Sequence, residues 1–97
     1  MHMRMELKAQ DEKTAEGLRI LARIIDRGGV VDTAGPMNTD GVVDVYANYV
    51  DASATDRLIE SLTDMTHEDW TGDSGMEHRT YSGMLFGRRL NIITTTD

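Results

Sequence analysis

The sequence contains no cysteine among its 97 residues. Without cysteine there is no disulfide framework, no thiolate metal site and no cysteine nucleophile. The sequence also lacks an apolar run near the roughly 20 residues that span a bilayer, and it lacks the apolar N-terminal stretch of a secretory signal. We therefore expect a cytoplasmic protein that does not interact with membranes.

Basic residues are scarce beyond the N-terminal third. No lysine follows Lys13, and Arg57 is the one strong base between Gly28 and His78. That same stretch holds eleven carboxylates, Asp32, Asp40, Asp44, Asp51, Asp56, Glu60, Asp64, Glu68, Asp69, Asp73 and Glu77, and the whole chain has a formal charge of −7. A field of this sign repels nucleic acid and attracts basic protein surfaces or cations. The charge pattern predicts a protein partner with a basic surface and no direct binding of nucleic acid.

The chain length and composition are typical of one small globular domain. The sequence is 39% hydrophobic and 28% charged, which is ordinary for a soluble protein. We assign residues 11–97 to this domain. Residues 1–10 are interpreted as a tag remnant followed by a flexible N-terminus, because Met1, His2 and Met3 are typical of a cloning scar.

Helical periodicity predicts a first helix over residues 11–27. Asp11 is suited to cap its start, and Gly28 is suited to the left-handed residue that ends many helices. Its apolar face is predicted to comprise Ala15, Leu18, Leu21, Ala22 and Ile25. Ile20 and Ile24 lie outside that arc. We therefore expect either that they are buried, with this helix covered over a wider face than an ordinary surface helix, or that these two residues form the self-contact of a homodimer.

A second helix is predicted over residues 53–66, starting near Ser53 with Asp56 in a short capping box. Its apolar face would comprise Thr55, Leu58, Ile59, Leu62 and Met65. Asp56, Glu60 and Asp64 stand at i, i+4 and i+8 on the opposite side, and Glu68 follows if the helix persists. Arg57 alone is placed to relieve the repulsion among them. We expect a further helical turn over residues 67–70 and a core position for Trp70.

Residues 30–34, 42–50, 78–86 and 88–95 are rich in β-branched or aromatic residues and are predicted to be strands. Glycine-containing loops separate them at residues 35–41 and 72–75, and a tight turn at Phe86 and Gly87 would join the last two. The resulting αββαββ order predicts a small α+β domain, with a four-stranded antiparallel sheet and both helices on one face. The expected core residues are Leu18, Leu21, Ile25, Val45, Leu58, Leu62 and Tyr81.

One segment concentrates side chains that can bind metal ions: His67, Glu68, Asp69, Asp73, Glu77 and His78. Nitrogen and carboxylate ligands suit Zn²⁺ or Mn²⁺. Their spacing matches no known metal-binding template, however, and a solvated acidic loop explains the same residues. We therefore expect neither a metal nor another cofactor.

The sequence carries no catalytic motif, so we expect a non-enzymatic protein-binding module. Its partner-binding residues are predicted to be Asp56, Glu60, Asp64, Glu68, Asp69 and Asp73. Such a module would occupy a basic surface of its partner, in the manner of a nucleic-acid mimic or an inhibitor from a mobile element. Two alternatives remain: a structural or assembly subunit that acts as a homodimer, and a metal-dependent hydrolase that uses the cluster from His67 to His78.

Overall fold

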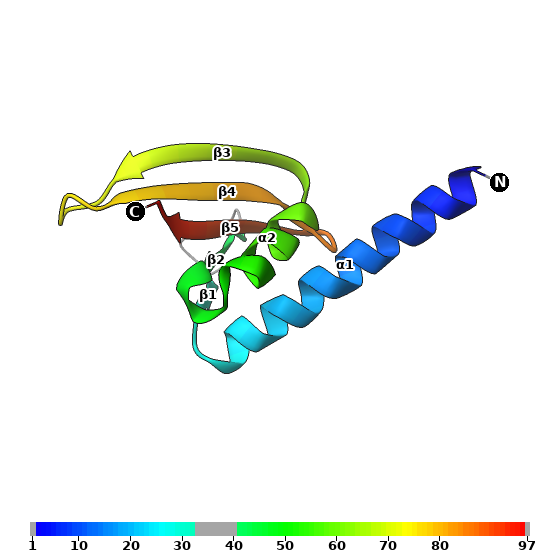
Figure 1. Cartoon of the computed structure of the whole chain (residues 1–97), viewed down its shortest axis with the longest axis horizontal. Helices are drawn as coiled ribbons and strands as arrows, with labels where there is room; N and C mark the ends of the chain where they lie inside the picture. The colour runs from blue at the N-terminus through cyan, green and yellow to red at the C-terminus, as the bar shows by residue number, and fades with distance from the viewer. Residues whose placement is uncertain (1, 33–40, 97) are drawn as a thin grey trace.

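A computed structural model describes residues 2–32 and 41–96 as two helices packed on one five-stranded sheet (Figure 1). The elements in chain order are α1 (His2–Asp26), β1 (Val30–Asp32), β2 (Val43–Tyr46), the 3₁₀ turn η1 (Ala47–Tyr49), α2 (Ala52–Glu60), β3 (Thr63–Thr71), β4 (Glu77–Leu85) and β5 (Arg88–Thr95). The predicted α+β class is confirmed. Most of the loop predicted at residues 35–41, and the last two residues of the strand predicted at 30–34, lie outside the described residues.

The sheet differs from the predicted four-stranded antiparallel arrangement. Its strand order is β1-β2-β5-β4-β3, and β2 pairs with β5 in parallel while the other pairs are antiparallel. The additional strand is β3, in the segment where the sequence predicted helix. Because α2 returns the chain before β3, and β3, β4 and β5 then alternate in direction, β5 runs parallel to β2. One extra strand therefore changed both the size and the type of the sheet.

The prediction for α1 chose the wrong face of the helix. Ile20 and Ile24 are 1% and 0% exposed, whereas Leu18 and Ile25 are 38% and 56% exposed. The buried face also includes Gly17, so a residue without a side chain occupies a core position. Both faces show helical spacing, and the prediction favoured the one without glycine. The isoleucines belong to the chain's own core, which confirms the first of the two expectations for them, and neither has exposed surface left for the alternative self-contact.

The predicted start of α1 is wrong, whereas its predicted end is confirmed. The helix begins at His2, so Asp11 lies within it and does not cap it. At the other end, Gly28 has φ +80° as predicted, and the Gly29 amide donates to the Ile24 carbonyl at 2.9 Å. The interpretation of residues 1–10 as a tag remnant stays a prediction.

The second helix is shorter than predicted. Asp51 caps α2, since its carboxylate accepts a hydrogen bond from the Ala54 amide at 3.2 Å, and the helix ends at Glu60 rather than at residue 66. Asp64, which was expected on the last helical turn, has φ +52° and lies at a register irregularity in β3. The predicted turn over residues 67–70 is also strand.

The core lies between the helices and one face of the sheet. Buried apolar residues from α1, β2, η1, α2, the α2–β3 connection, β4 and β5 form one cluster of Ile20, Ile24, Val43, Val45, Ala47, Ala54, Leu58, Leu62, Leu85, Leu90 and Ile92. Three predicted core residues, Val45, Leu58 and Leu62, are buried, and Leu21 and Tyr81 pack against the cluster. The turn at Phe86 and Gly87 is confirmed, with φ +48° and +76°.

Candidate functional site

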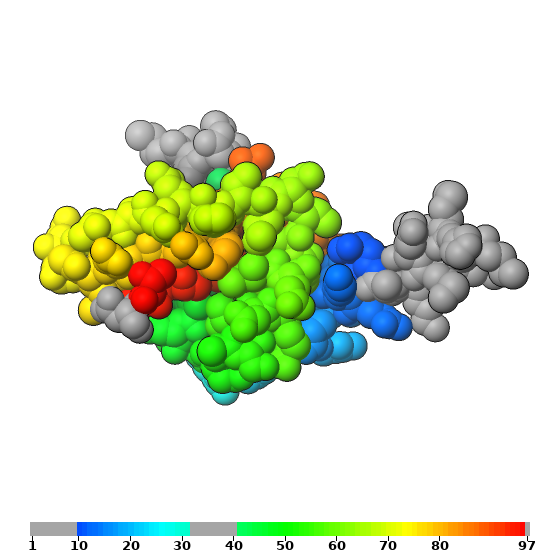
Figure 2. All heavy atoms as spheres, turned by 45° about the horizontal axis from the view of Figure 1, so that its top comes forward, coloured from blue at the N-terminus to red at the C-terminus, as the bar shows by residue number. Residues whose placement is uncertain are grey.

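The six predicted partner-binding acids are all exposed, but they do not form one helical stripe. Asp56 and Glu60 lie on α2, three more lie on β3, and Asp73 lies in the turn between β3 and β4. Figure 2 looks onto α2 in green and β3 in yellow-green, which lie next to each other on this side of the molecule. The sheet edge and α2 are therefore neighbours, but alternation along β3 points Glu68 to the sheet face opposite the one that packs on the helices.

Arg57 does not neutralise the acids of its own helix. Its Nε lies 3.1 Å from Glu16 Oε1, and Glu16 Oε2 lies 3.1 Å from Arg19 on α1. The Arg57 guanidinium therefore links α2 to α1 through this ion pair and does not pair with Asp56 or Glu60. The prediction that Arg57 relieves the acidic stripe is wrong, because tertiary packing supplies a carboxylate from the other helix.

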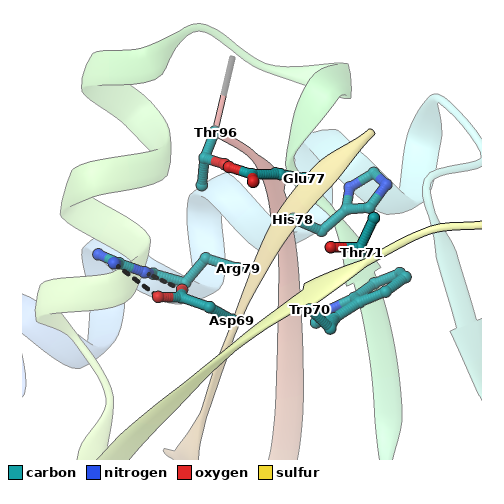
Figure 3. A pocket seen from close by; sticks show the side chains of 7 residues that line it. All are labelled: Asp69, Trp70, Thr71, Glu77, His78, Arg79 and Thr96. Atoms are coloured by element: carbon teal, nitrogen blue, oxygen red, sulfur yellow. Dashed lines mark hydrogen bonds and ion pairs between the residues drawn. The ribbon is translucent and has the colours of Figure 1, made fainter. Parts of the chain in front are cut away.

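Asp69 differs from the other acids because it has its own cation. Arg79, opposite it on β4, donates from Nε to Oδ1 at 2.6 Å and from Nη2 to Oδ2 at 3.2 Å (Figure 3). These hydrogen bonds lower the pKa of the Asp69 carboxyl and raise the pKa of the Arg79 guanidinium. Asp69 thus contributes little free negative charge, and its expected role in partner binding is not supported by this geometry.

We call the remaining five exposed acids together the acidic surface: Asp56, Glu60, Asp64, Glu68 and Asp73. Among the residues whose side chains the structure describes, 10–31 and 41–96, no basic side chain forms an ion pair with any of them. The nearby guanidinium groups of Arg57 and Arg79 are engaged with Glu16 and Asp69 instead. The acidic surface is therefore open to cations from outside the chain.

Because the Arg79 hydrogen bonds favour ionised Asp69, the carboxyl should titrate below its ordinary pKa of 3.8. The stability that this pair contributes should be present above the unfolded-state pKa and should disappear as pH falls through the lowered folded-state pKa. A carbon-detected NMR titration of Asp69 measures this directly. Arg79→Gln should move the midpoint back towards 3.8, whereas Arg57→Gln should not, and equal midpoints in wild type and Arg79→Gln would contradict the assignment.

The proposed metal ligands do not come together. In strands, successive side chains point to opposite faces, so His67 and Asp69 face one way while Glu68 faces the other. Among the described residues, which include all six of these side chains, no group of three or more histidine or carboxylate side chains is placed to hold a metal ion. The hydrolase alternative therefore lacks the ligand cluster on which it depended.

Trp70 is on the surface, so its predicted place in the core is wrong. It is 41% exposed, its ring stacks on His78 with centroids 4.4 Å apart, and its Nε1 donates to Thr80 Oγ1 at 2.8 Å. Trp70 and His78 lie at a hollow of about 450 Å³ at the end of the β3–β4 hairpin (Figure 3). The hollow is lined by Asp69, Trp70, Thr71, Glu77, His78, Arg79 and Thr96.

Sequence reasoning missed the cross-strand contacts of the sheet. On the same face as Trp70, Ser82 Oγ donates to Asn91 Oδ1 at 2.7 Å, and Asn91 Nδ2 donates to Asp44 Oδ1 at 3.2 Å. This chain of hydrogen bonds joins β4, β5 and β2. The signal for it was the alternation within each strand, but the pairing of the strands was needed to find it.

Neither helix among the described residues has the length and apolar character needed to cross a bilayer. The chain shows no match to a protein-family model, a curated protein or a solved structure, so its function has to be inferred from its own residues.

Proposed function

We propose that this protein is a non-enzymatic binding module whose acidic surface occupies a basic surface of a partner protein. The observation that supports the proposal is that five exposed carboxylates on α2, β3 and the following turn have no ion-pair partner among the described residues. Complementary charge of this kind accelerates encounter and selects among partners more than it sets affinity.

The spacing of the acids favours a partner with separate basic side chains. Asp56 and Glu60 are one helical turn apart, about 6 Å along the axis. Glu68 lies four positions after Asp64 along β3, at most about 13 Å away. Duplex DNA presents one charge every ~1.7 Å of axis. The charges of the acidic surface are therefore much more widely spaced than the phosphates of duplex DNA. The protein could replace nucleic acid only on a partner that contacts few phosphate positions.

Charge reversal at the acidic surface tests the proposal. The variant replaces Asp56, Glu60 and Glu68 by Lys, and it keeps Asp64 because Asp tolerates the left-handed conformation better than Lys. We expect partners captured by the wild-type protein from a lysate of its source organism to be lost from this variant. Added salt should also release them from the wild type, because exposed charges are screened over about 8 Å at physiological ionic strength.

The matched control replaces Asp11, Glu12 and Asp26, three exposed acids of α1, by Lys. It changes the net charge by the same amount and should retain the partner. Equal loss from both variants would show that only overall charge matters, and retention by both would exclude the acidic surface.

A further inference from the structure

β3 is an edge strand with an open side. In the part of the chain that the structure describes, it is last in the strand order and pairs with β4 alone, so its outer edge carries a row of backbone N–H and C=O groups without a strand partner there (Figure 1). All nine residues of β3 are exposed, on both faces of the sheet. The other edge strand, β1, has three residues. β3 is therefore the longer of the two edge strands with which another extended chain could pair.

The free edge is regular over most of its length. The register with β4 shifts between Thr63 and Thr66, near Asp64 with its positive φ, and then runs without interruption from Thr66 to Thr71. Edge strands are commonly protected by such irregularities, by short length or by charged side chains. Here the irregularity protects one end only, and the charges are acidic. The regular part leaves room for an added strand of about six residues, roughly 20 Å long.

The side chains on this edge define the chemistry of the added strand. Glu68 and Trp70 share one face, as the Trp70 bond to Thr80 on the paired strand shows. A lysine or arginine placed opposite Glu68 gains a cross-strand ion pair, and the next cation on the same face meets the half-exposed indole of Trp70. Asp69 points to the other face and is already paired with Arg79. An extended segment with cations at alternate positions therefore fits the edge.

A second copy of the chain fits the same edge poorly. Self-pairing would bring two strands, each with the unpaired carboxylates of Asp64 and Glu68, to the ~4.8 Å separation of neighbouring strands. Each chain carries a formal charge of −7. Like charges across strands are destabilising, so the acids act against self-association while they favour a basic strand.

We infer that the β3 edge is the docking strand of this module, and that the partner adds an extended, alternately basic segment as a sixth strand of the sheet. This inference rests on the proposed function and specifies how the acidic surface is used. Main-chain hydrogen bonds to β3 would hold the segment, and Glu68 with Trp70 would select its side chains.

The test uses a capped synthetic peptide, acetyl-Lys-Val-Lys-Val-Lys-Val-Lys-amide, and the same peptide N-methylated at every residue. Both carry the same charge, but the residues of the methylated form have no backbone N–H to donate. We expect the unmethylated peptide to bind the full chain, and methylation to weaken binding by about tenfold or more, the loss of at least one net hydrogen-bond contribution of ~1.4 kcal/mol. In hydrogen exchange followed by NMR, the β3 amides that do not bond to β4 should slow on binding.

Two variants connect binding to the side chains. Glu68→Lys should weaken binding of the unmethylated peptide, whereas Glu12→Lys, the same reversal at an exposed position of α1, should not. Equal binding of the two peptides would overturn the docking strand while leaving charge-driven partner binding intact. The inference also fails if the unmethylated peptide does not bind at about 1 mM, or if the β3 amides are already protected in a dimer of the free protein. Failure of the proposed function would appear separately, in the lysate experiment.

Discussion

Replacing Ile24 by Ala should lower the free energy of unfolding by about 2–5 kcal/mol, the range for removing a large aliphatic side chain from a packed core. Ile24 is 0% exposed and lies where α1 packs on the rest of the core, so the substitution leaves a cavity that the surrounding residues fill only in part. Urea unfolding, followed by circular dichroism, measures the change. The slope of the transition should stay the same, because the folded state remains compact.

Ile25→Ala is the matched control. The chemical change is identical and the residue is adjacent, but Ile25 is 56% exposed. We expect a loss of less than about 1 kcal/mol, because surface substitutions away from special features have small effects. If Ile25→Ala costs as much as Ile24→Ala, α1 packs through the face that the sequence predicted, and the helix orientation described above is wrong.

Gly17→Ala should destabilise the protein by about 1–3 kcal/mol, although alanine is the better helix former by roughly 1 kcal/mol. Gly17 lies inside α1, where an added Cβ would approach Ser61 Cβ at the end of α2 to 2.6 Å. Real Cβ atoms do not come this close, so the helices would have to separate. The sign of the effect therefore distinguishes close helix packing from simple helix propensity.

Thermal and urea unfolding of Gly17→Ala measure this effect, and a second substitution identifies its cause. In the double variant with Ser61→Gly, the clashing side chain is absent, so part of the lost stability should return despite the loss of the hydrogen bond that Ser61 Oγ donates to the Leu58 carbonyl. A rise in stability for Gly17→Ala alone would show that α1 and α2 are not in close contact at this point.

Several local features could be predicted from the sequence because they depend on nearby residues. The left-handed Gly28 ends α1, and the Phe86-Gly87 turn joins β4 to β5. Each feature depends on backbone sterics.

The identity of β3 could not be obtained in this way. An edge strand that is exposed on both faces needs no apolar alternation, so residues 63–71 show no strand pattern, and their acids matched the spacing of a preceding helix. The candidate site shares this difficulty. The sequence placed the acids on the surface, but it could not show that Arg79 would neutralise Asp69 or that Glu16 of α1 would take Arg57 away from Asp56 and Glu60.

The sequence by itself determined the acidic charge of the middle of the chain, the α+β class and the positions of most elements, because these follow from composition and from short-range periodicity. Only the tertiary structure decided which face of α1 is buried, how five strands are ordered and which carboxylates remain unpaired. The physical reason is that burial and ion pairing are properties of contacts between distant segments. Ile24 and Ile25 are equally apolar, and they differ only in whether the sheet and α2 lie against them.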